Sequence, residues 1–179
     1  MEVCWRLCLT AHMDNDKKQI ALRMIPYGLY VLTSQSPDGA TCAVTVAWVT
    51  QCSFSPPLVV VAIGCQSSAY DVIKKAGAFA LNILGKDQKG IAETFSKPVE
   101  HAEDTIGGEA FHIGESGSPL LENSLAYLDC NLVVALEKGD HAVAIGEVVD
   151  AKAPSISEDR PDEVSLWLKD LGADIYYGG

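Results

Sequence analysis

Basic residues are scarce in this chain: 13 lysines and arginines stand against 24 aspartates and glutamates, a formal net charge of -11 at pH 7. Nucleic acids and anionic membranes bind positively charged surfaces, so the composition argues against both as partners and favours a small molecule or another protein. Long apolar runs are also missing. None reaches the roughly 18 residues of a membrane span, and the first residues lack the apolar stretch and cleavage site of a secretory signal. We therefore expect a soluble, cytoplasmic protein.

Several ligand-binding patterns are absent as well. The six cysteines form no Cys-x-x-Cys pair, and the four histidines lack the spacing of metal ligands. Most of the cysteines lie in apolar runs, which is typical of small buried side chains in a reducing compartment. Neither Gly-x-Gly-x-x-Gly nor Gly-x-x-x-x-Gly-Lys follows a predicted strand. These absences argue against a metal site, a disulfide framework, a Rossmann-type dinucleotide site and a P-loop.

The apolar fraction of 48% is enough for one domain with a sizeable core. Runs rich in β-branched residues predict strands at 27–35, 40–54, 56–64 and 78–85, a hairpin over 125–151 with its turn near 138–140, and one more strand within 163–179. Helical signals lie at 14–25, 67–77 and 86–98. The polar segment 99–119 is expected to be a long loop that covers a ligand.

About six strands in short-range antiparallel connections, with short peripheral helices, predict a mainly β fold. A small barrel is favoured over a doubly wound sheet, and a βαβ unit over 57–84 is the rival interpretation. We expect the domain to span residues 18–179. Residues 1–17 are expected to be an N-terminal extension, since 1–13 match no periodic pattern.

Two serines after the third predicted strand are the first candidate site. Ser67 and Ser68 open a helix, and a Ser-x-x-Asp capping box is predicted from Ser68 to Asp71, with Gly77 as the helix stop. Helix N-termini expose unpaired N–H groups, so hydroxyls there can complete a phosphate cradle. Simple helix capping explains the same serines, and these residues alone favour it.

Two further features carry polar groups into apolar strands. Thr45, Trp48, Thr50 and Gln51 could line a flat heterocycle, although period-two alternation explains them as a solvated face with Trp48 in the core. His141 follows the predicted turn and shares a strand face with Val143 and Ile145. A histidine there can meet a ligand or gate its approach, and an exposed turn residue is the plainer interpretation.

Taken in order, several stretches resemble the flavin reductase-like FMN-binding family. The resemblance covers about residues 18–179 and is most specific at Ser-Phe-x-Pro-Pro (53–57), Phe-Ala-x-Asn-x-Leu (79–84) and Gly-Asp-His (139–141), with Tyr-Tyr-Gly-Gly at the end of the chain. It implies an FMN-binding split β-barrel of Greek-key type that forms a homodimer, with FMN near the interface. It also implies an oxidoreductase that passes hydride from NADH or NADPH to the flavin for a downstream acceptor. Flavoredoxin-like electron carriers without nicotinamide activity resemble the chain too and stay open as an alternative, as does docking onto a redox partner protein.

The resemblance also implies roles for particular residues. The segment 45–51 would lie along the isoalloxazine edge, Ser67 and Ser68 would hold the phosphate, and His141 would stand where the nicotinamide stacks. Many relatives carry a basic residue just before the serines, where this chain has Cys65 and Gln66. Lys97 is the candidate replacement for that charge, because lysine is an effective point-charge binder of phosphate. The complete set of expected flavin contacts is Thr45, Val46, Ala47, Trp48, Val49, Thr50, Gln51, Cys65, Gln66, Ser67, Ser68 and Lys97.

Overall fold

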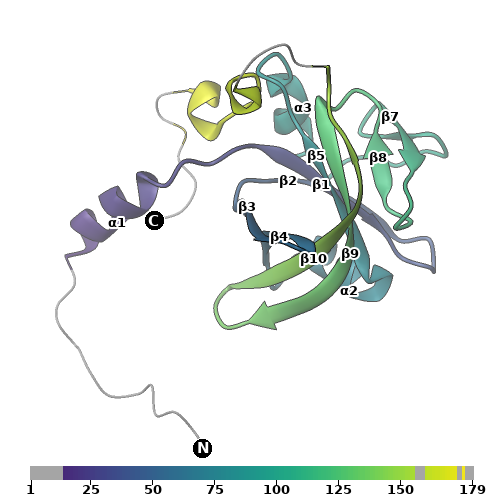
Figure 1. Ribbon diagram of the computed structural model, residues 1–179, viewed down its shortest axis with the longest axis horizontal. Helices are drawn as coiled ribbons and strands as arrows, with labels where there is room; N and C mark the ends of the chain where they lie inside the picture. The colour runs from purple at the N-terminus through teal and green to yellow at the C-terminus, as the bar shows by residue number, and fades with distance from the viewer. Residues whose placement is uncertain (1–13, 156–159, 173–174, 176–179) are drawn as a thin grey trace, which may run out of the picture.

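The computed structural model describes residues 14–155, 160–172 and 175, and Figure 1 shows their arrangement. The resemblance at 176–179 and the expectation for residues 1–13 lie outside these residues. The helices are α1 (Asn15–Arg23), α2 (Ser68–Ala76) and α3 (Lys89–Thr94), with 3-10 helices at Pro161–Glu163 and Leu168–Leu171. The strands are β1 (Tyr30–Gln35), β2 (Thr41–Val46), β3 (Val49–Phe54), β4 (Pro57–Gly64), β5 (Ala78–Ile83), β6 (Thr105–Ile106), β7 (Glu109–Ile113), β8 (Pro119–Leu121), β9 (Ala126–Glu137) and β10 (His141–Lys152).

A seven-stranded sheet in the order β2-β1-β5-β9-β10-β4-β3 forms the body of the molecule. All its neighbouring strands pair antiparallel, and the sheet curls on itself (Figure 1). β4 and β5 are not neighbours in it, so residues 57–84 do not form a βαβ unit. The prediction of a mainly β, barrel-like fold with short helices is confirmed, although the described residues form ten strands rather than about six.

The core lies inside the curled sheet. Its centre is formed by side chains that are fully buried: Leu32, Val61, Phe79 and Leu81. Ile73 of α2 packs against them from one side. A second apolar cluster lies between the sheet, α3 and the segment around Leu166. Burial of these alternating side chains is what fixes the register of each strand, because a slip by one residue would turn its apolar set outward.

The predicted long strand at 40–54 is in fact two strands. β2 ends at Val46, and Ala47 and Trp48 lead into β3 at Val49. The reason is a change of partner: Val46 still pairs with Tyr30 of β1, whereas Val49 pairs with Val61 of β4 at the other end of the sheet order. The break therefore lets one segment run along both edges of the sheet and nearly close the barrel.

The predicted loop at 99–119 also differs from the structure, since it contains β6 and β7 and reaches the start of β8 in a separate three-stranded sheet. Short strands of two to five residues give too little alternation to be recognised in a sequence. A buried carboxylate anchors this sheet: Asp129 of β9 accepts hydrogen bonds from the backbone N–H (2.8 Å) and the hydroxyl of Ser116.

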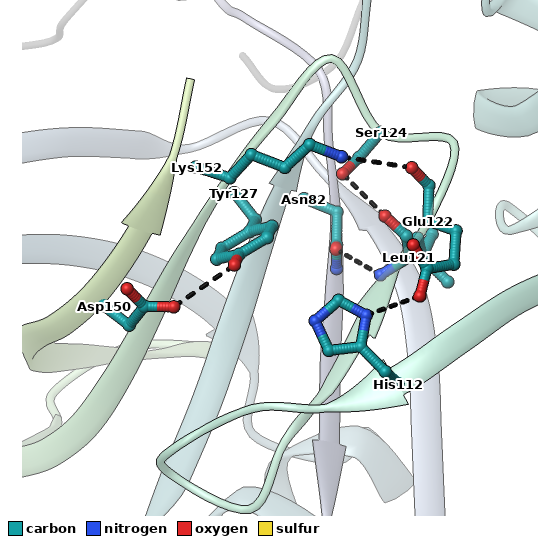
Figure 2. A network of polar contacts seen from close by, with 8 residues as sticks. All are labelled: Asn82, His112, Leu121, Glu122, Ser124, Tyr127, Asp150 and Lys152. Carbon is teal, nitrogen blue, oxygen red and sulfur yellow. Dashed lines mark hydrogen bonds and ion pairs between the residues drawn. The ribbon is translucent and has the colours of Figure 1, made fainter. Parts of the chain in front are cut away.

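Figure 2 shows a second set of contacts that attaches the small sheet to the large one. His112 Nδ1 lies 2.6 Å from Glu122 Oε1, and Lys152 Nζ donates to the Glu122 carbonyl at 3.3 Å. The hydroxyl of Tyr127 donates to Asp150 at 3.2 Å. Lys152 thus joins β10 to the end of β8, and the N–H of Leu121 in β8 donates to Asn82 of β5 at 2.8 Å, whereas the other two contacts brace the small sheet and the hairpin from within.

The strand predicted within 163–179 is not present in the described part of that segment, which holds the 3-10 helix Leu168–Leu171. The apolar residues there serve the second core cluster instead, and Leu166 is fully buried. Single bridges, Gly28 to Trp167 and Gly85 to Ser165, and backbone hydrogen bonds such as those of Leu166 with Leu29 and Leu84 join it to the sheet. Within the described residues, no helix is long and apolar enough to cross a membrane. Helix α1 begins at Asn15, inside the stretch expected to be an extension, and buries no side chain.

Candidate functional site

Two adjoining cavities lie beside the segment where the chain passes from β2 to β3. The first, of about 240 Å³, is lined by residues 44–48 of the β2–β3 segment, 62–64 of β4, Ser67 and His141. The second, of about 320 Å³, is lined by residues 41–44, 67–69, 95–99 and His101. Val44 and Ser67 line both, so the two cavities adjoin; together they are called the hollow, and they extend from the β9–β10 turn to the start of α2.

His141 stands at the mouth of the first cavity because of the hairpin that carries it. It is the first residue of β10 and pairs with Gly64, the last residue of β4. Its imidazole Nδ1 lies 2.9 Å from Asp140 Oδ1, and its ring centroid lies 4.7 Å from that of Trp48. The hydrogen bond from His141, and then its charge, lower the pKa of the Asp140 carboxyl. The predicted turn at 138–140 and the face that His141 shares with Val143 are both confirmed.

Trp48 forms the wall opposite the turn. Its ring also approaches Tyr27, with centroids 6.5 Å apart, so three rings follow one another from the body of the domain to the cavity mouth. The side chain of His141 is 23% exposed as a result. Its ring can therefore meet a ligand in the cavity while aromatic packing limits its motion.

The start of α2 closes the far end of the hollow. Ser67, not Ser68, is the N-cap, and its hydroxyl accepts a hydrogen bond from the N–H of Ala69 at 3.2 Å. The predicted Ser68–Asp71 capping box is thus wrong by one residue, because Ser67 already has the extended backbone that a cap requires. Gly77 ends the helix in the left-handed conformation, as predicted.

Lys97 reaches the same end of the hollow from the segment after α3. It lines the second cavity together with Ser67, Ser68 and His101. Two hydroxyls, a lysine ammonium, an imidazole and the positive dipole end of a helix form a set of groups that suits a phosphate. His101 was not found by sequence reasoning, because nothing in the polar segment 99–119 marks it out. Of the described residues, no group of three or more His, Cys, Asp or Glu could hold a metal ion.

Other predicted site residues lie elsewhere. Val49, Thr50 and Gln51 belong to β3 and line neither cavity, and Thr50 and Gln51 are exposed. Cys65 directs its sulfur to the carbonyl of Gly139 at 3.7 Å, and Gln66 is exposed. The structure therefore gathers Thr45, Val46, Ala47, Trp48, Ser67, Ser68, Lys97 and His141 around the hollow and leaves Val49, Thr50, Gln51, Cys65 and Gln66 at its margin.

Thr45 shows how the hollow keeps its shape. Its hydroxyl donates to the carbonyl of Ala92 at 2.8 Å, and its N–H donates to the carbonyl of Phe95 at 2.9 Å. These bonds hold β2 against α3 and the segment that carries Lys97. The two walls of the second cavity are thereby fixed to each other.

Comparison with known proteins agrees with this geometry. Residues 22–170 match the family described as "Flavin reductase like domain". A flavin reductase of Pseudomonas putida is 32% identical over 143 residues, which are 80% of this chain and 82% of that protein. The reductase component of a 4-nitrophenol 4-monooxygenase/4-nitrocatechol 2-monooxygenase from Rhodococcus opacus is 36% identical over 126 residues, covering 70% of this chain and 65% of the relative.

A solved structure supports the same grouping. The Streptomyces globisporus NADH:FAD oxidoreductase SgcE6, in complex with NAD and FAD fragments, superposes with a TM-score of 0.67 at 27% identity, over 82% of this chain and 87% of that one. The fold, the order of the sequence motifs and these relatives agree, and the chain belongs to the flavin reductase like family.

Proposed function

We propose that this protein is a flavin reductase that takes hydride from NADH or NADPH and passes reduced FMN to a partner oxygenase in the cytoplasm. The observation that carries the proposal is the pair of adjoining cavities, one lined by a phosphate-type donor set and the other by an aromatic mouth with a histidine. The similarity to flavin reductases, one of them a monooxygenase component, supports it. The same relatives disfavour a carrier that does not react with nicotinamide.

The residues present suit a flavin mononucleotide. The phosphate fits the end of the hollow, where the start of α2 and the hydroxyls of Ser67 and Ser68 donate, Lys97 supplies positive charge and His101 offers a ring nitrogen. The overall charge of -11 does not oppose this, because distant surface charges are screened over about 8–10 Å. The ring system fits the first cavity, along the backbone of residues 44–48.

The protein itself supplies binding and orientation rather than covalent chemistry. When bound, the flavin supplies the hydride-accepting centre. Ala47 and Trp48, at the break between β2 and β3, line the first cavity where the ring would lie; their carbonyls already accept hydrogen bonds from the N–H groups of Val49 (3.2 Å) and Ala62 (3.0 Å), so they shape the cavity wall. Trp48 and His141 cover the mouth and limit the entry of water. His141 orients the nicotinamide or stabilises charge there, and its contact with Asp140 fixes the direction of the imidazole.

A homodimer is part of this proposal. The outer face of β9 and β10 carries Val134, Leu136, Val143 and Ile145, and the first three are 37–50% exposed. His141 lies at the end of the same face, so a second copy packed there would border the hollow. Light scattering is expected to give twice the chain mass, and a mass of 19.1 kDa at micromolar concentration would contradict the dimer.

The test is an absorbance titration followed by reduction. The purified protein is titrated with FMN, FAD and riboflavin, and NADH or NADPH is then added without oxygen. We expect FMN to bind more tightly than riboflavin and its visible band to bleach with one of the nicotinamides. Tighter binding of FAD would change the cofactor assignment. A bound flavin that neither nicotinamide bleaches would favour the electron carrier and contradict the reductase.

A further inference from the structure

A buried tyrosine joins the helix at the phosphate end of the hollow to the turn that carries His141. Tyr70, in the first turn of α2, is 1% exposed, and its hydroxyl donates to Glu137 Oε1 at 2.6 Å. Glu137 is the last residue of β9, just before the turn that leads to His141. The contact therefore links two elements that are 67 residues apart in the chain.

The turn has little else to hold it in place. Residues 137–140 are all exposed, and a Cβ added at Gly139 would meet no atom within 4 Å. Apart from its strand pairing and the packing of the adjacent His141 ring on Trp48, the described residues tie the turn through the N–H of Cys65, which donates to the Asp140 carbonyl at 2.9 Å, and through the longer sulfur contact to Gly139. An exposed hairpin tip with so few contacts would open readily without a fixed partner.

Tyr70 is such a fixed partner. Its ring lies in the main core cluster, and the ammonium of Lys74 stands 4.2 Å from the ring centroid. A hydroxyl that donates to a carboxylate makes a shorter and stronger hydrogen bond than one between neutral groups. A flexible carboxylate at the tip is thus held by a donor that cannot move without disturbing the core.

We propose that Tyr70 is a positioning residue that acts on His141 through Glu137 and the 138–140 turn. The proposal rests on the proposed function, in which His141 meets the nicotinamide. Loss of the tie leaves the flavin contacts in place, because Ser67, Ser68 and Lys97 do not depend on it. It lets the turn move, so the imidazole is no longer held where the nicotinamide stacks. Loss of the Tyr70–Glu137 hydrogen bond should therefore raise the KM for the nicotinamide and change the flavin affinity little.

The test uses Tyr70→Phe, which keeps the buried ring and removes only the hydroxyl. Tyr127→Phe is the matched control, because it also removes a hydroxyl that donates to a carboxylate, that of Asp150, at the opposite end of the same hairpin (Figure 2). Glu137→Ala breaks the tie from the exposed side, where a folding defect is not expected. Glu137→Gln keeps an oxygen that can accept the hydrogen bond from Tyr70, so this variant should behave largely like the wild type.

Two measurements decide the outcome. Hydrogen exchange of the flavin-free protein should rise over residues 137–141 in Tyr70→Phe and Glu137→Ala, and stay unchanged there in Tyr127→Phe. Steady-state assays should then show the nicotinamide KM raised by about tenfold in the same two variants, with the flavin Kd within about twofold of the wild type.

Three outcomes would overturn the positioning role. They are equal exchange rates in Tyr70→Phe and Tyr127→Phe, a rise in exchange over the whole chain, and faster exchange of the turn with an unchanged nicotinamide KM. If the wild type oxidises neither NADH nor NADPH, the proposed function fails, and the exchange data still show whether Tyr70 holds the turn.

Discussion

The two ends of the β9–β10 hairpin make the same kind of bond for different purposes. At the base, the hydroxyl of Tyr127 donates to Asp150, within the contacts that attach the three-stranded sheet (Figure 2). At the tip, the hydroxyl of Tyr70 donates to Glu137, next to the turn that carries His141. The base is covered by a second sheet, whereas the tip is exposed and borders the hollow. The base therefore serves stability, and the tip serves the placement of a side chain.

The middle of the hairpin separates these ends. The register between β9 and β10 shifts at Ile145 and Gly146, and the Gly146 backbone packs directly on Phe79. A Cβ at Gly146 would lie 2.5 Å from Phe79 Cζ and 2.9 Å from Cys130 Cβ. This close approach holds the strands on the core, so disturbance at one end need not reach the other.

The largest effect is expected at this central glycine. Gly146→Ala should lower the free energy of unfolding by about 3 kcal/mol, because the fully buried Phe79 has no room to move aside. Gly139→Ala is the matched control at the tip, where the added methyl meets open space, and should cost less than about 0.5 kcal/mol. Urea unfolding of the two variants measures the difference. Equal losses of unfolding free energy in the two variants would show that the middle and the tip of the hairpin tolerate an added methyl group equally.

At the base, the buried carboxylate of Asp129 is the next most sensitive position. Asp129→Ala should cost about 2 kcal/mol, since it leaves the N–H and hydroxyl of Ser116 without their acceptor. Flavin affinity and nicotinamide KM should not change, because Asp129 lies on the side of the three-stranded sheet. Thermal unfolding and steady-state kinetics test both halves of the prediction, and a changed KM would contradict the division between base and tip.

Much of the tip could be predicted from the sequence, because its signals are local. Gly139 and Asp140 between two apolar runs predict a turn, and the alternation after it correctly places His141 opposite Ala142. The start of α2 could be predicted to within one residue for the same reason, because the capping serines are adjacent to the helix in the sequence. The barrel followed from the order and type of the strands, which depend on short-range connections.

What could not be predicted depends on contacts between distant residues. Nothing at Ala47 and Trp48 marks the break between β2 and β3, because the chain changes partner there without a glycine or proline. The short strands β6 and β7 belong to a sheet that is attached by distant residues, Asp129 through Ser116 and Lys152 through the Glu122 carbonyl. The contact of Tyr70 with Glu137 spans 67 residues and has no local signature.

His141 should show the opposite pattern to Asp129. His141→Ala is expected to lower turnover with NADH or NADPH by about tenfold, because the donor loses a group that orients it. The protein should still bind FMN, since the phosphate end of the hollow is unchanged, and its unfolding free energy should fall by about 1 kcal/mol, the size of the lost ring contact with Trp48. A stopped-flow measurement of flavin reduction gives the rate directly. Unchanged turnover would remove His141 from the redox site.

An alkaline titration tests the tie at the tip through Tyr70; burial and the hydrogen bond to Asp150 raise the pKa of Tyr127 at the base as well. The hydrogen bond to Glu137, together with burial, raises the pKa of Tyr70 to about 12 from its ordinary value near 10. Stability from this group is complete below pH 10 and is lost as pH rises toward 12, because the folded state holds the proton longer than the unfolded state. Burial also raises the pKa of Cys42 and Cys130 to about 12, so some loss remains in every variant. Tyr70→Phe should therefore lose less stability than the wild type between pH 10 and 12 in urea unfolding. Parallel curves would contradict the tie at the tip.

The smallest effect is expected at the far end of the hollow from the turn. Lys97 is exposed, and a single exposed charge contributes little, so Lys97→Gln should weaken FMN binding by only about threefold. The loss should shrink as salt is raised, because added ions screen the contact between ammonium and phosphate.

Riboflavin, which lacks the phosphate, supplies the control: its affinity should be the same in the wild type and in Lys97→Gln. Lys89→Gln, on α3 but absent from the lining of the second cavity, tests whether any lost positive charge has the same effect. An equal loss for riboflavin, or for Lys89→Gln, would mean that Lys97 acts through the general field and not at the phosphate. The hollow would then rely on the start of α2 and its two serines to hold the phosphate.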